Sequence, residues 1–309
     1  MVTKRPMESE NHCIIVICGP TGVGKTDLAI KLAQYFDTEI ISADSRQIYM
    51  ELNIGTAKPT NEQLSKVKHH LINYISVQEK FTAGDFERVA LKIAAGIMNR
   101  KKIAILCGGS GLYIKAFLEG FDDLPEVPSE IKKELQKEFE TNGLSDMLNE
   151  LEKKDPFYFE EVDRRNPHRV IRALAVIRSS GLPFSELRSG KKKVRPFKVI
   201  KIGIGLSREV LYDTLNQRLD SMIDDGLMDE ARAMMKYKNE SSLQTVGYNE
   251  AFEYLEGKIT LEESVKLMKK NSRNYAKRQF TWFRKDSGIT WFEPNEYDLI
   301  LEHIREHLN

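Results

Sequence analysis

The chain has 309 residues, of which 41% are hydrophobic and 30% are charged. This length suits one large core with an appendage or two modest domains, and the hydrophobic content excludes a disordered chain. The 47 Lys and Arg residues nearly cancel the 46 Asp and Glu, giving a net charge of +1, so overall charge indicates no particular partner.

The cysteines and the hydropathy of the chain indicate its cellular compartment. Cys13, Cys18 and Cys107 lie in or beside apolar runs and form no C-x-x-C pair. We expect buried, reduced thiols, with a zinc site as the minor alternative. No apolar stretch approaches the ~20 residues that span a bilayer, and the first dozen residues lack the apolar segment of a signal peptide. We therefore expect a cytoplasmic protein without membrane contact.

The N-terminal elements predict a phosphate site. Residues 14–18 form a continuous apolar run, which indicates a buried parallel strand, and residues 25–35 carry a helical apolar stripe. Between them lies the P-loop pattern G-x-x-x-x-G-K-[ST], formed by Gly19, Pro20, Thr21, Gly22, Val23, Gly24, Lys25 and Thr26. Its backbone N–H groups and the helix N-terminus attract phosphate, Lys25 can reach the terminal oxygens, and the Thr26 hydroxyl can ligate Mg²⁺. A glycine-rich turn without a ligand is the disfavoured alternative, because strand, motif and helix occur together.

Strands and helices continue to alternate as far as residue 118. Strands are expected at 39–42 and 103–107, with a candidate strand at 70–75, and helices at 82–98 and 112–118. A capping-box-like pair, Thr82 and Asp85, opens the first of these helices. This alternation indicates an open parallel sheet covered by helices on both faces.

The pattern changes at about residue 124. No convincing strand occurs between 124 and 198, only charged helical segments such as 129–139 and 144–153. Strand character returns at 199–206, followed by a helix at 207–225, a long helix from Thr260 to about Arg284, and a last strand at 289–292. The predicted fold is therefore α/β. A P-loop core, residues 1–123 and 199–309, has a parallel sheet covered by helices and is interrupted by a smaller all-helical insertion domain, residues 124–198.

A carboxylate follows the second predicted strand. Asp44 is expected at the carboxyl edge of the sheet, beside the P-loop, where ligands of open α/β sheets bind. It could be a Mg²⁺ ligand, a general base or the N-cap of the next helix, and the residues alone do not separate these roles. The P-loop fits kinases, ATPases, GTPases and other enzymes that hold pyrophosphate, although the N-K-x-D guanine reader of GTPases is missing.

Six further segments carry a resemblance to a known family. They are DSRQIY (44–49), NIGTAKP (53–59), HHLI (69–72), GGSGLY (108–113), VGY (246–248) and RNYAKRQFTWF (273–283). With the P-loop, and in this order, they resemble the motifs of the bacterial tRNA dimethylallyltransferases over about residues 14–291. The resemblance implies transfer of a dimethylallyl group from dimethylallyl pyrophosphate to N6 of the adenosine immediately 3′ of the tRNA anticodon. It also implies release of pyrophosphate and a requirement for Mg²⁺.

The resemblance assigns roles to individual residues. Asp44 matches the family's proposed general base, which would accept a proton from a weakly nucleophilic adenine amine. Arg218 matches the catalytic arginine and, with Lys25, would stabilise the charge of the departing pyrophosphate. Ser110 stands where the family usually has threonine and is expected to contact the pyrophosphate, while Thr26 is expected to hold Mg²⁺.

Three segments match tRNA-binding positions of the family. They comprise Asp44, Ser45, Arg46 and Gln47; His168, Arg169, Val170, Ile171 and Arg172; and Gln244, Thr245, Val246, Gly247, Tyr248 and Asn249. The first would surround the target base, which is expected to leave the stack of the anticodon loop. For the second, the residues alone favour a solvated helix turn. The expected partners are the tRNA anticodon arm and dimethylallyl pyrophosphate, bound by a monomer.

The last long helix carries a basic stripe. Residues 266–285 contain no acid, and spacings of three, four and seven align Lys266, Lys270, Arg273, Lys277 and Arg284 on one face. A face of like charges would repel itself, so a stripe that binds tRNA phosphates is favoured over a solvated face, with Lys270, Arg273 and Lys277 as contacts. The aromatic side chains of this helix, Tyr275, Phe280, Trp282 and Phe283, indicate core packing rather than base stacking.

Two alternatives remain open. A small-molecule kinase on the same core would require ATP and would have no use for the basic helix. A nucleic-acid-binding ATPase would lack transfer chemistry. We expect the P-loop to hold an allylic pyrophosphate and ATP to bind weakly at most.

Overall fold

The computed structural model describes residues 12–122, 124–188, 190 and 192–308. The segment in which we expect no signal peptide therefore lies outside the described residues, except for His12. The chain divides into two compact units, unit 1 with Met1–Glu119 and Val194–Asn309, and unit 2 with Gly120–Lys193. In the part of the chain that the structure describes, no helix is both long and apolar enough to cross a bilayer.

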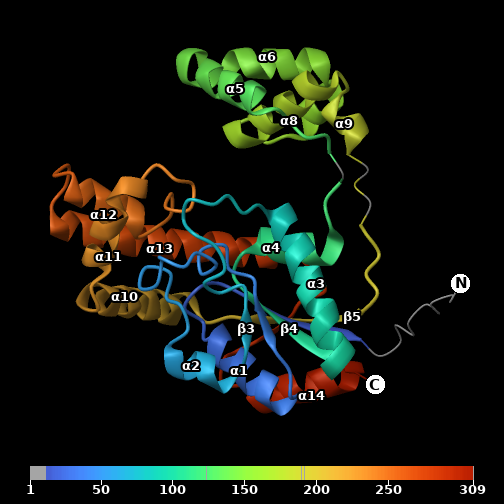
Figure 1. Ribbon diagram of the computed structural model, residues 1–309, viewed down its shortest axis with the longest axis vertical. Helices are drawn as coiled ribbons and strands as arrows, with labels where there is room; N and C mark the ends of the chain where they lie inside the picture. Colours follow the sequence, from blue (N-terminus) through green and yellow to red (C-terminus); the bar gives the residue numbers. More distant parts are fainter. Residues whose placement is uncertain (1–11, 123, 189, 191, 309) are drawn as a thin grey trace, which may run out of the picture. The chain divides into compact units, whose positions relative to one another are not determined.

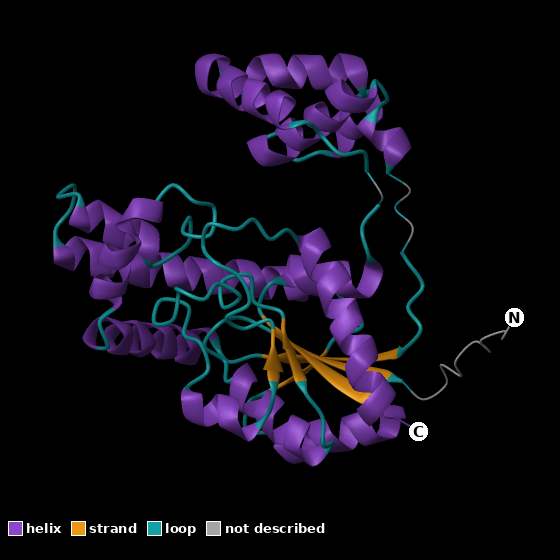
Figure 2. Cartoon of the chain, in the orientation of Figure 1, coloured by secondary structure: helices purple, strands orange, loops and turns teal. Residues whose placement is uncertain are grey.

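Unit 1 is built on a parallel sheet of six strands in the order β3-β2-β4-β1-β5-β6 (Figures 1 and 2). The strands are β1 (Cys13–Cys18), β2 (Ile40–Ser42), β3 (His69–His70), β4 (Ile103–Gly108), β5 (Lys198–Ile204) and β6 (Thr290–Phe292). The central strand β1 pairs with β4 on one side and with β5 on the other. The predicted parallel α/β fold is confirmed, and the loops after β1, β2 and β4 meet at one edge of the sheet.

Helices cover both faces because β1 alternates its side chains between two cores. Ile15 and Ile17 pack in one core with α1 (Lys25–Tyr35) and α14 (Tyr297–Leu308). Ile14 and Val16 pack in the other with α3 (Ala83–Lys101) and α4 (Gly111–Glu119). The three cysteines are free thiols in or next to these layers.

A third core joins the C-terminal helices of unit 1. It contains side chains from α10 (Arg208–Asp224), α11 (Leu227–Met234), α12 (Tyr248–Leu255) and α13 (Leu261–Phe283). At the start of α10 the Ser207 hydroxyl accepts a hydrogen bond from the Val210 N–H, and at the start of α13 Thr260 forms a capping box with Glu263. A short 3₁₀ helix, η2 (Met235–Tyr237), follows α11, and α2 (Asn61–Lys66) precedes β3.

The third strand is shorter than the strand predicted at 70–75, so the predicted boundaries were wrong. It covers only His69–His70, because Leu71 (φ 62°) and Asn73 (φ 53°) adopt left-handed backbone conformations that an extended strand excludes. Ile75 forms only an isolated bridge with Tyr49.

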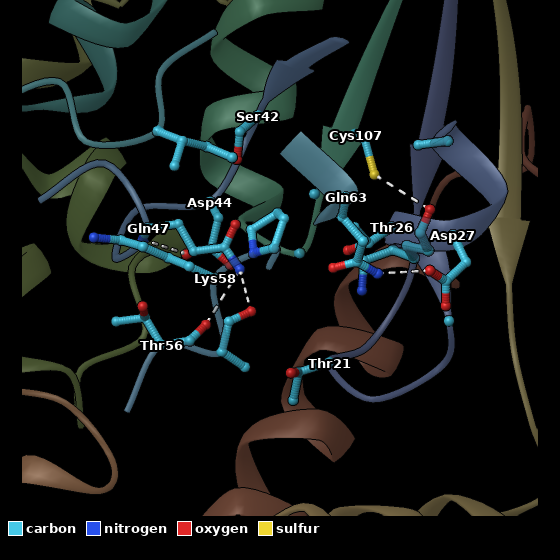
Figure 3. A pocket seen from close by; sticks show the side chains of 18 of the residues that line it. Thr21, Thr26, Asp27, Ser42, Asp44, Gln47, Thr56, Lys58, Gln63 and Cys107 are labelled. Carbon is cyan, nitrogen blue, oxygen red and sulfur yellow. Dashed lines mark hydrogen bonds between the residues drawn. The ribbon is translucent and has the colours of Figure 1, made fainter. Parts of the chain in front are cut away.

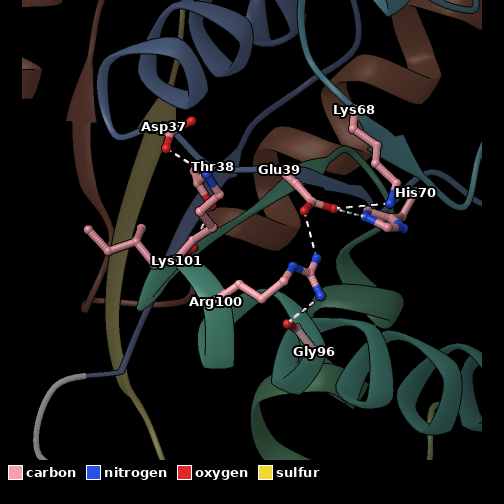
Figure 4. Close-up of polar contacts among 9 residues, drawn as sticks. Asp37, Thr38, Glu39, Lys68, His70, Gly96, Arg100 and Lys101 are labelled. Carbon is pink, nitrogen blue, oxygen red and sulfur yellow. Dashed lines mark hydrogen bonds and ion pairs between the residues drawn. The ribbon is translucent and has the colours of Figure 1, made fainter.

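A polar cluster anchors this short edge strand (Figure 4). The Glu39 carboxylate accepts hydrogen bonds from His70 Nε2 at 2.6 Å and from the Arg100 guanidinium at 2.7 Å, and Lys68 lies 3.5 Å away. Burial alone would raise the pKa of Glu39, but the bonds from Arg100 and His70 outweigh it and lower this pKa to about 2. The cluster therefore ties β2 and β3 to α3 through one half-buried carboxylate.

Among its described residues, unit 2 contains helices joined by loops and no strand. It contains α5 (Ser129–Asn142), α6 (Ser145–Lys154), α7 (Pro156–Glu161), α8 (Pro167–Ser180) and α9 (Phe184–Leu187) around a core of its own. Arg178 of α8 forms ion pairs with Glu138 at 2.8 Å and Glu150 at 2.6 Å, which joins three of the helices.

Candidate active site

The glycine loop after β1 has a shape that its sequence dictates. Gly19 has φ 143°, and a Cβ on it would lie 2.3 Å from the Ile204 carbonyl oxygen of β5, so only glycine fits. Gly24 has φ 83° and precedes α1, whose first turn has no side-chain cap. Its leading N–H groups are therefore available to an anionic ligand.

Lys25 lies folded over this loop. Its Nζ donates a hydrogen bond to the Pro20 carbonyl oxygen at 2.5 Å. Burial lowers the pKa of the Lys25 ammonium, and nearby Asp44 opposes the shift. A bound anion would favour the charged form in the same way.

Gln279 is a site residue that we did not predict. It is buried on α13, where its Oε1 accepts the Thr21 N–H at 2.9 Å and its Nε2 donates to the Gly109 carbonyl oxygen at 2.9 Å. It therefore joins the glycine loop to the loop after β4. The only sign of this role in the sequence is that Gln279 is an uncharged amide that follows two cations in RNYAKRQFTWF.

Asp44 is held by its own loop. Its Oδ1 accepts the N–H groups of Arg46 at 2.8 Å and Gln47 at 3.2 Å, while its Oδ2 has no hydrogen-bond partner among the described residues. The side chain thus caps the turn after β2 with one oxygen and leaves the other free to accept a proton.

Arg218 of α10 contacts the glycine loop at Thr21. Its Nη1 donates to the Thr21 hydroxyl at 3.3 Å. Burial lowers the pKa of its guanidinium, and Asp44 opposes this shift, yet an arginine stays charged at neutral pH. A fixed cation therefore faces the loop 197 residues away in sequence.

Two cavities meet at these residues. The first, of about 270 Å³, runs from the glycine loop past Thr26, Lys58 and His69 (Figure 3). The second, of about 100 Å³, is lined by Thr245, Val246 and Tyr275 among others. Both are lined by Thr21, Asp44, Thr56 and Arg218. Asp44 and Arg218 thus stand where the two cavities adjoin.

Ser110 does not line either cavity. Its Oγ accepts the Ser45 N–H at 2.9 Å and lies 3.1 Å from the Ser45 Oγ. The side chain that we expected to contact pyrophosphate instead holds the loop that carries Asp44.

Arg46 lines the second cavity and Gln47 lines the first. The Arg46 guanidinium donates to the carbonyl oxygens of Ser241 and Ser242, both at 2.9 Å. Gln47 Nε2 donates to the carbonyl oxygens of Thr56 at 3.2 Å and Ala57 at 3.1 Å. The Arg46 guanidinium and the Gln47 amide therefore hold in place the neighbouring loops that contain these carbonyl groups.

Tyr248 is fully buried, so its side chain cannot contact RNA as we expected. Its hydroxyl donates to Glu230 Oε1 at 2.5 Å. The same Glu230 carboxylate accepts the N–H groups of Asn53, Ile54 and Gly55 at 2.9, 2.9 and 3.0 Å. This clamp holds the loop that supplies Gly55 and Thr56 to the second cavity.

Other expected RNA contacts are placed unevenly. Thr245, Val246 and Gly247 line the second cavity, whereas Gln244 and Asn249 are exposed outside it. In unit 2, His168, Arg169 and Arg172 are exposed and Ile171 is half-buried. Val170 is wholly buried in the core of that unit, so its side chain cannot reach a ligand.

The basic stripe lies on the far side of α13 from the cavities. Lys270, Arg273 and Lys277 each stand two residues before a cavity-lining residue (Ser272, Tyr275 and Gln279). Residues two positions apart in a helix are separated by about 200° around its axis, so the basic row and the cavity-lining row point in nearly opposite directions. Arg273 is also hydrogen-bonded to Asn216 on α10 at 2.7 Å. The stripe therefore does not line the site. The residue spacing predicted which side chains share a face of the helix, but it could not predict whether that face points toward the cavities.

These features define an α/β protein with a glycine loop at the carboxyl edge of a parallel sheet, flanked by a carboxylate and an arginine where two cavities meet. The family model described as IPP transferase matches residues 47–286, and the chain belongs to this family.

Its relatives are similar over nearly their whole length. A tRNA dimethylallyltransferase of Cytophaga hutchinsonii is 46% identical, over 96% of this chain and 98% of its own. One from Christiangramia forsetii is also 46% identical, over 97% and 99%. The solved structure of a tRNA isopentenylpyrophosphate transferase from Bacillus halodurans is 35% identical with a TM-score of 0.72, covering 96% of this chain and 97% of its own. A eukaryotic dimethylallyltransferase acting on tRNA is 26% identical with a TM-score of 0.75, covering 96% and 77%.

Proposed function

We propose that this chain transfers a dimethylallyl group from dimethylallyl pyrophosphate to N6 of the adenosine immediately 3′ of the tRNA anticodon, releasing pyrophosphate. The observation that carries the proposal is the position of Asp44 and Arg218 where two cavities adjoin. A donor held in the first cavity and an adenine held in the second would meet at these residues. The names of the relatives support this activity.

In this proposal the first cavity holds the pyrophosphate. The N–H groups of the glycine loop and of the first turn of α1 would bind its oxygens, with Lys25 as counter-charge. As the allylic C–O bond breaks, negative charge grows on the leaving group, and Arg218 is positioned to stabilise it. The Thr21 hydroxyl, which accepts from Arg218, orients the guanidinium toward the loop.

Asp44 would act on the acceptor. The adenine amine is a weak nucleophile, because its lone pair is delocalised into the ring, and it carries a proton that must leave as the new C–N bond forms. The free Oδ2 of Asp44 can accept that proton, while Oδ1 keeps the side chain fixed to its turn.

The oxygen ligands at the first cavity fit Mg²⁺. Thr26, Ser42 and Asp44 all line it, and hydroxyl and carboxylate oxygens are the donors that this hard cation prefers. When bound, the ion would neutralise charge on the pyrophosphate, with the Thr26 hydroxyl as the expected protein ligand.

The test is mass spectrometry of tRNA nucleosides. Purified protein, unmodified tRNA, dimethylallyl pyrophosphate and Mg²⁺ should yield an adenosine heavier by one five-carbon unit, together with free pyrophosphate. Replacing the donor with ATP should leave the tRNA unchanged and produce no ADP. A protein that converts ATP to ADP with a small hydroxylated acceptor, and leaves tRNA unprenylated, would establish the kinase alternative instead.

A further inference from the structure

Two histidines and a glutamate lie together near the end of α14. They are His303, Glu306 and His307, and we call them the α14 cluster. Each side chain can offer one ligand atom, and these atoms all lie within 4.8 Å of one another. Among the residues that the structure describes, no other group of three His, Cys, Asp or Glu side chains is close enough to hold a metal ion.

The helical spacing brings these side chains to one side of α14. Positions 303 and 307 are four residues apart and positions 303 and 306 three, so the side chains are neighbours on the helix surface. The two imidazole rings have their centres 4.2 Å apart. His303 is half-buried, and the centre of its ring lies 5.6 Å from that of Phe292, the last residue of β6. Packing against β6 therefore restricts this ring, which reduces the entropy lost when it binds a ligand.

A hydrogen bond sets the tautomer of His307. Its Nδ1 lies 2.9 Å from the backbone carbonyl oxygen of His303. Because a carbonyl oxygen can only accept, Nδ1 carries the proton, and the lone pair of the neutral ring is on Nε2. Metal-binding histidines commonly donate their other ring N–H to a carbonyl oxygen in this way. The backbone of α14 thus leaves His307 Nε2 free to bind a cation.

The charges at this end of the helix favour a cation. Glu306 is exposed and forms no salt bridge with any residue that the structure describes. The cluster ends in the last turn of α14 (Tyr297–Leu308), where the partial negative charge of a helix C-terminus attracts positive charge. Arg305, the cation within the cluster's own sequence, donates instead to the hydroxyl of Tyr35 on α1.

We propose that the α14 cluster binds a divalent cation of the zinc class, with His303, Glu306 and His307 as its ligands. Two imidazoles and one carboxylate form a three-ligand set that Zn²⁺ accepts, with water in the fourth position. None of the three residues lines either cavity, so the inference goes beyond the proposed function and does not depend on it. Ile300 and Ile304 of the same helix lie in the core shared with β1, so the ion would fasten the end of a helix that covers the sheet.

Calorimetric titration of the full chain with Zn²⁺ tests the site. The wild-type protein should bind one equivalent that His303→Ala binds more than about 10-fold more weakly, because even a lost outer-shell partner costs about 10–100-fold in metal affinity. His168→Ala removes an exposed histidine from unit 2 and is the matched control, which should bind Zn²⁺ as the wild type does. Equal stoichiometry and affinity in wild type and His303→Ala would overturn the proposal.

A moved histidine separates chelation from binding by single imidazoles. Glu302→His combined with His303→Gln keeps the number of imidazoles on α14 and shifts one of them by about 100° around the helix axis. This double variant should lose Zn²⁺ affinity as His303→Ala does. Wild-type affinity in the double variant would mean that isolated imidazoles bind the ion, which would refute the three-ligand site.

Electron paramagnetic resonance identifies the ligand atoms. Cu²⁺ serves as the probe because it binds nitrogen ligands more tightly than Zn²⁺ does. With one equivalent of Cu²⁺, the wild-type spectrum should show coupling to two imidazole nitrogens, and that of His307→Ala to one. An unchanged spectrum in His307→Ala would contradict the assignment. Since none of these measurements needs tRNA or a prenyl donor, failure of the metal site and failure of the proposed activity are separate results.

Discussion

Replacing Asp44 with asparagine separates the proposed base from the turn that holds it. In the structure, Oδ1 accepts the N–H groups of Arg46 and Gln47. An amide oxygen can accept both of these bonds, so the turn should survive in Asp44→Asn. The variant loses only the negative charge and the ability to take a proton.

The expected loss is therefore chemical. A positioned general base contributes about 10²–10⁴-fold, so the prenyl-transfer rate at saturating substrates should fall by that factor. This corresponds to about 3–5 kcal/mol in the activation free energy. Affinity for tRNA should change little, because the loop keeps its hydrogen bonds.

The assay is single-turnover formation of prenylated tRNA, measured by mass spectrometry beside a filter-binding measurement of tRNA affinity. Asp44→Ala is the structural control, since it removes the acceptor of both N–H bonds and should destabilise the loop by about 1–3 kcal/mol. If Asp44→Asn keeps a rate within a few-fold of wild type while Asp44→Ala loses activity, Asp44 shapes the loop and is not the base.

Three further outcomes are expected. Arg218→Ala should slow transfer by about 10²–10³-fold, and Arg218→Lys should restore only part of the rate, because a point charge lacks the guanidinium fork; full activity in the alanine variant would exclude Arg218 from the mechanism. Tyr248→Phe keeps the ring but removes the bond to Glu230, so urea unfolding should show a loss of about 1–2 kcal/mol, and unchanged stability would mean that the clamp contributes nothing. Because the pKa of Glu39 is about 2 instead of 4.5, its contribution to stability is complete above pH 4.5 and is lost as the pH falls toward 2. Unfolding curves of Glu39→Gln and wild type should therefore converge over this range, and a constant difference would refute the assignment.

Local signals made the first half of the fold predictable. The helix at Lys25–Tyr35 was predicted to the residue, because an apolar strand, fixed glycines and an amphipathic helix follow one another without long-range help. The prediction of a strand at 70–75 was wrong because Leu71 adopts a left-handed backbone conformation. An apolar residue rarely adopts this conformation, so nothing in the sequence indicated it.

The site was predictable as a set of residues and less so as a set of roles. The structure places Asp44 and Arg218, which motif membership had grouped, among the residues that line both cavities, whereas their roles stay predictions. It could not say that Tyr248 and Val170 are buried, since an apolar or aromatic residue in a motif serves the core and the ligand equally well. Nor could helical spacing say which side of α13 faces the cavities.

The distance in sequence between the partners of the glycine loop has a consequence for synthesis of the protein on the ribosome. Thr21 is hydrogen-bonded to Arg218 and Gln279, which follow it by 197 and 258 residues. At about 5–20 residues per second, the last of these partners emerges on the order of 10–50 s after the loop itself. Until β5 (Lys198–Ile204) is synthesised, the apolar strand β1 lacks this neighbour, whereas unit 2, which ends at Lys193, already contains its own core. Nascent chains arrested before residue 198 should therefore hold a folded helical unit, whereas the edge of β1 that pairs with β5 and the phosphate loop still lack their partners.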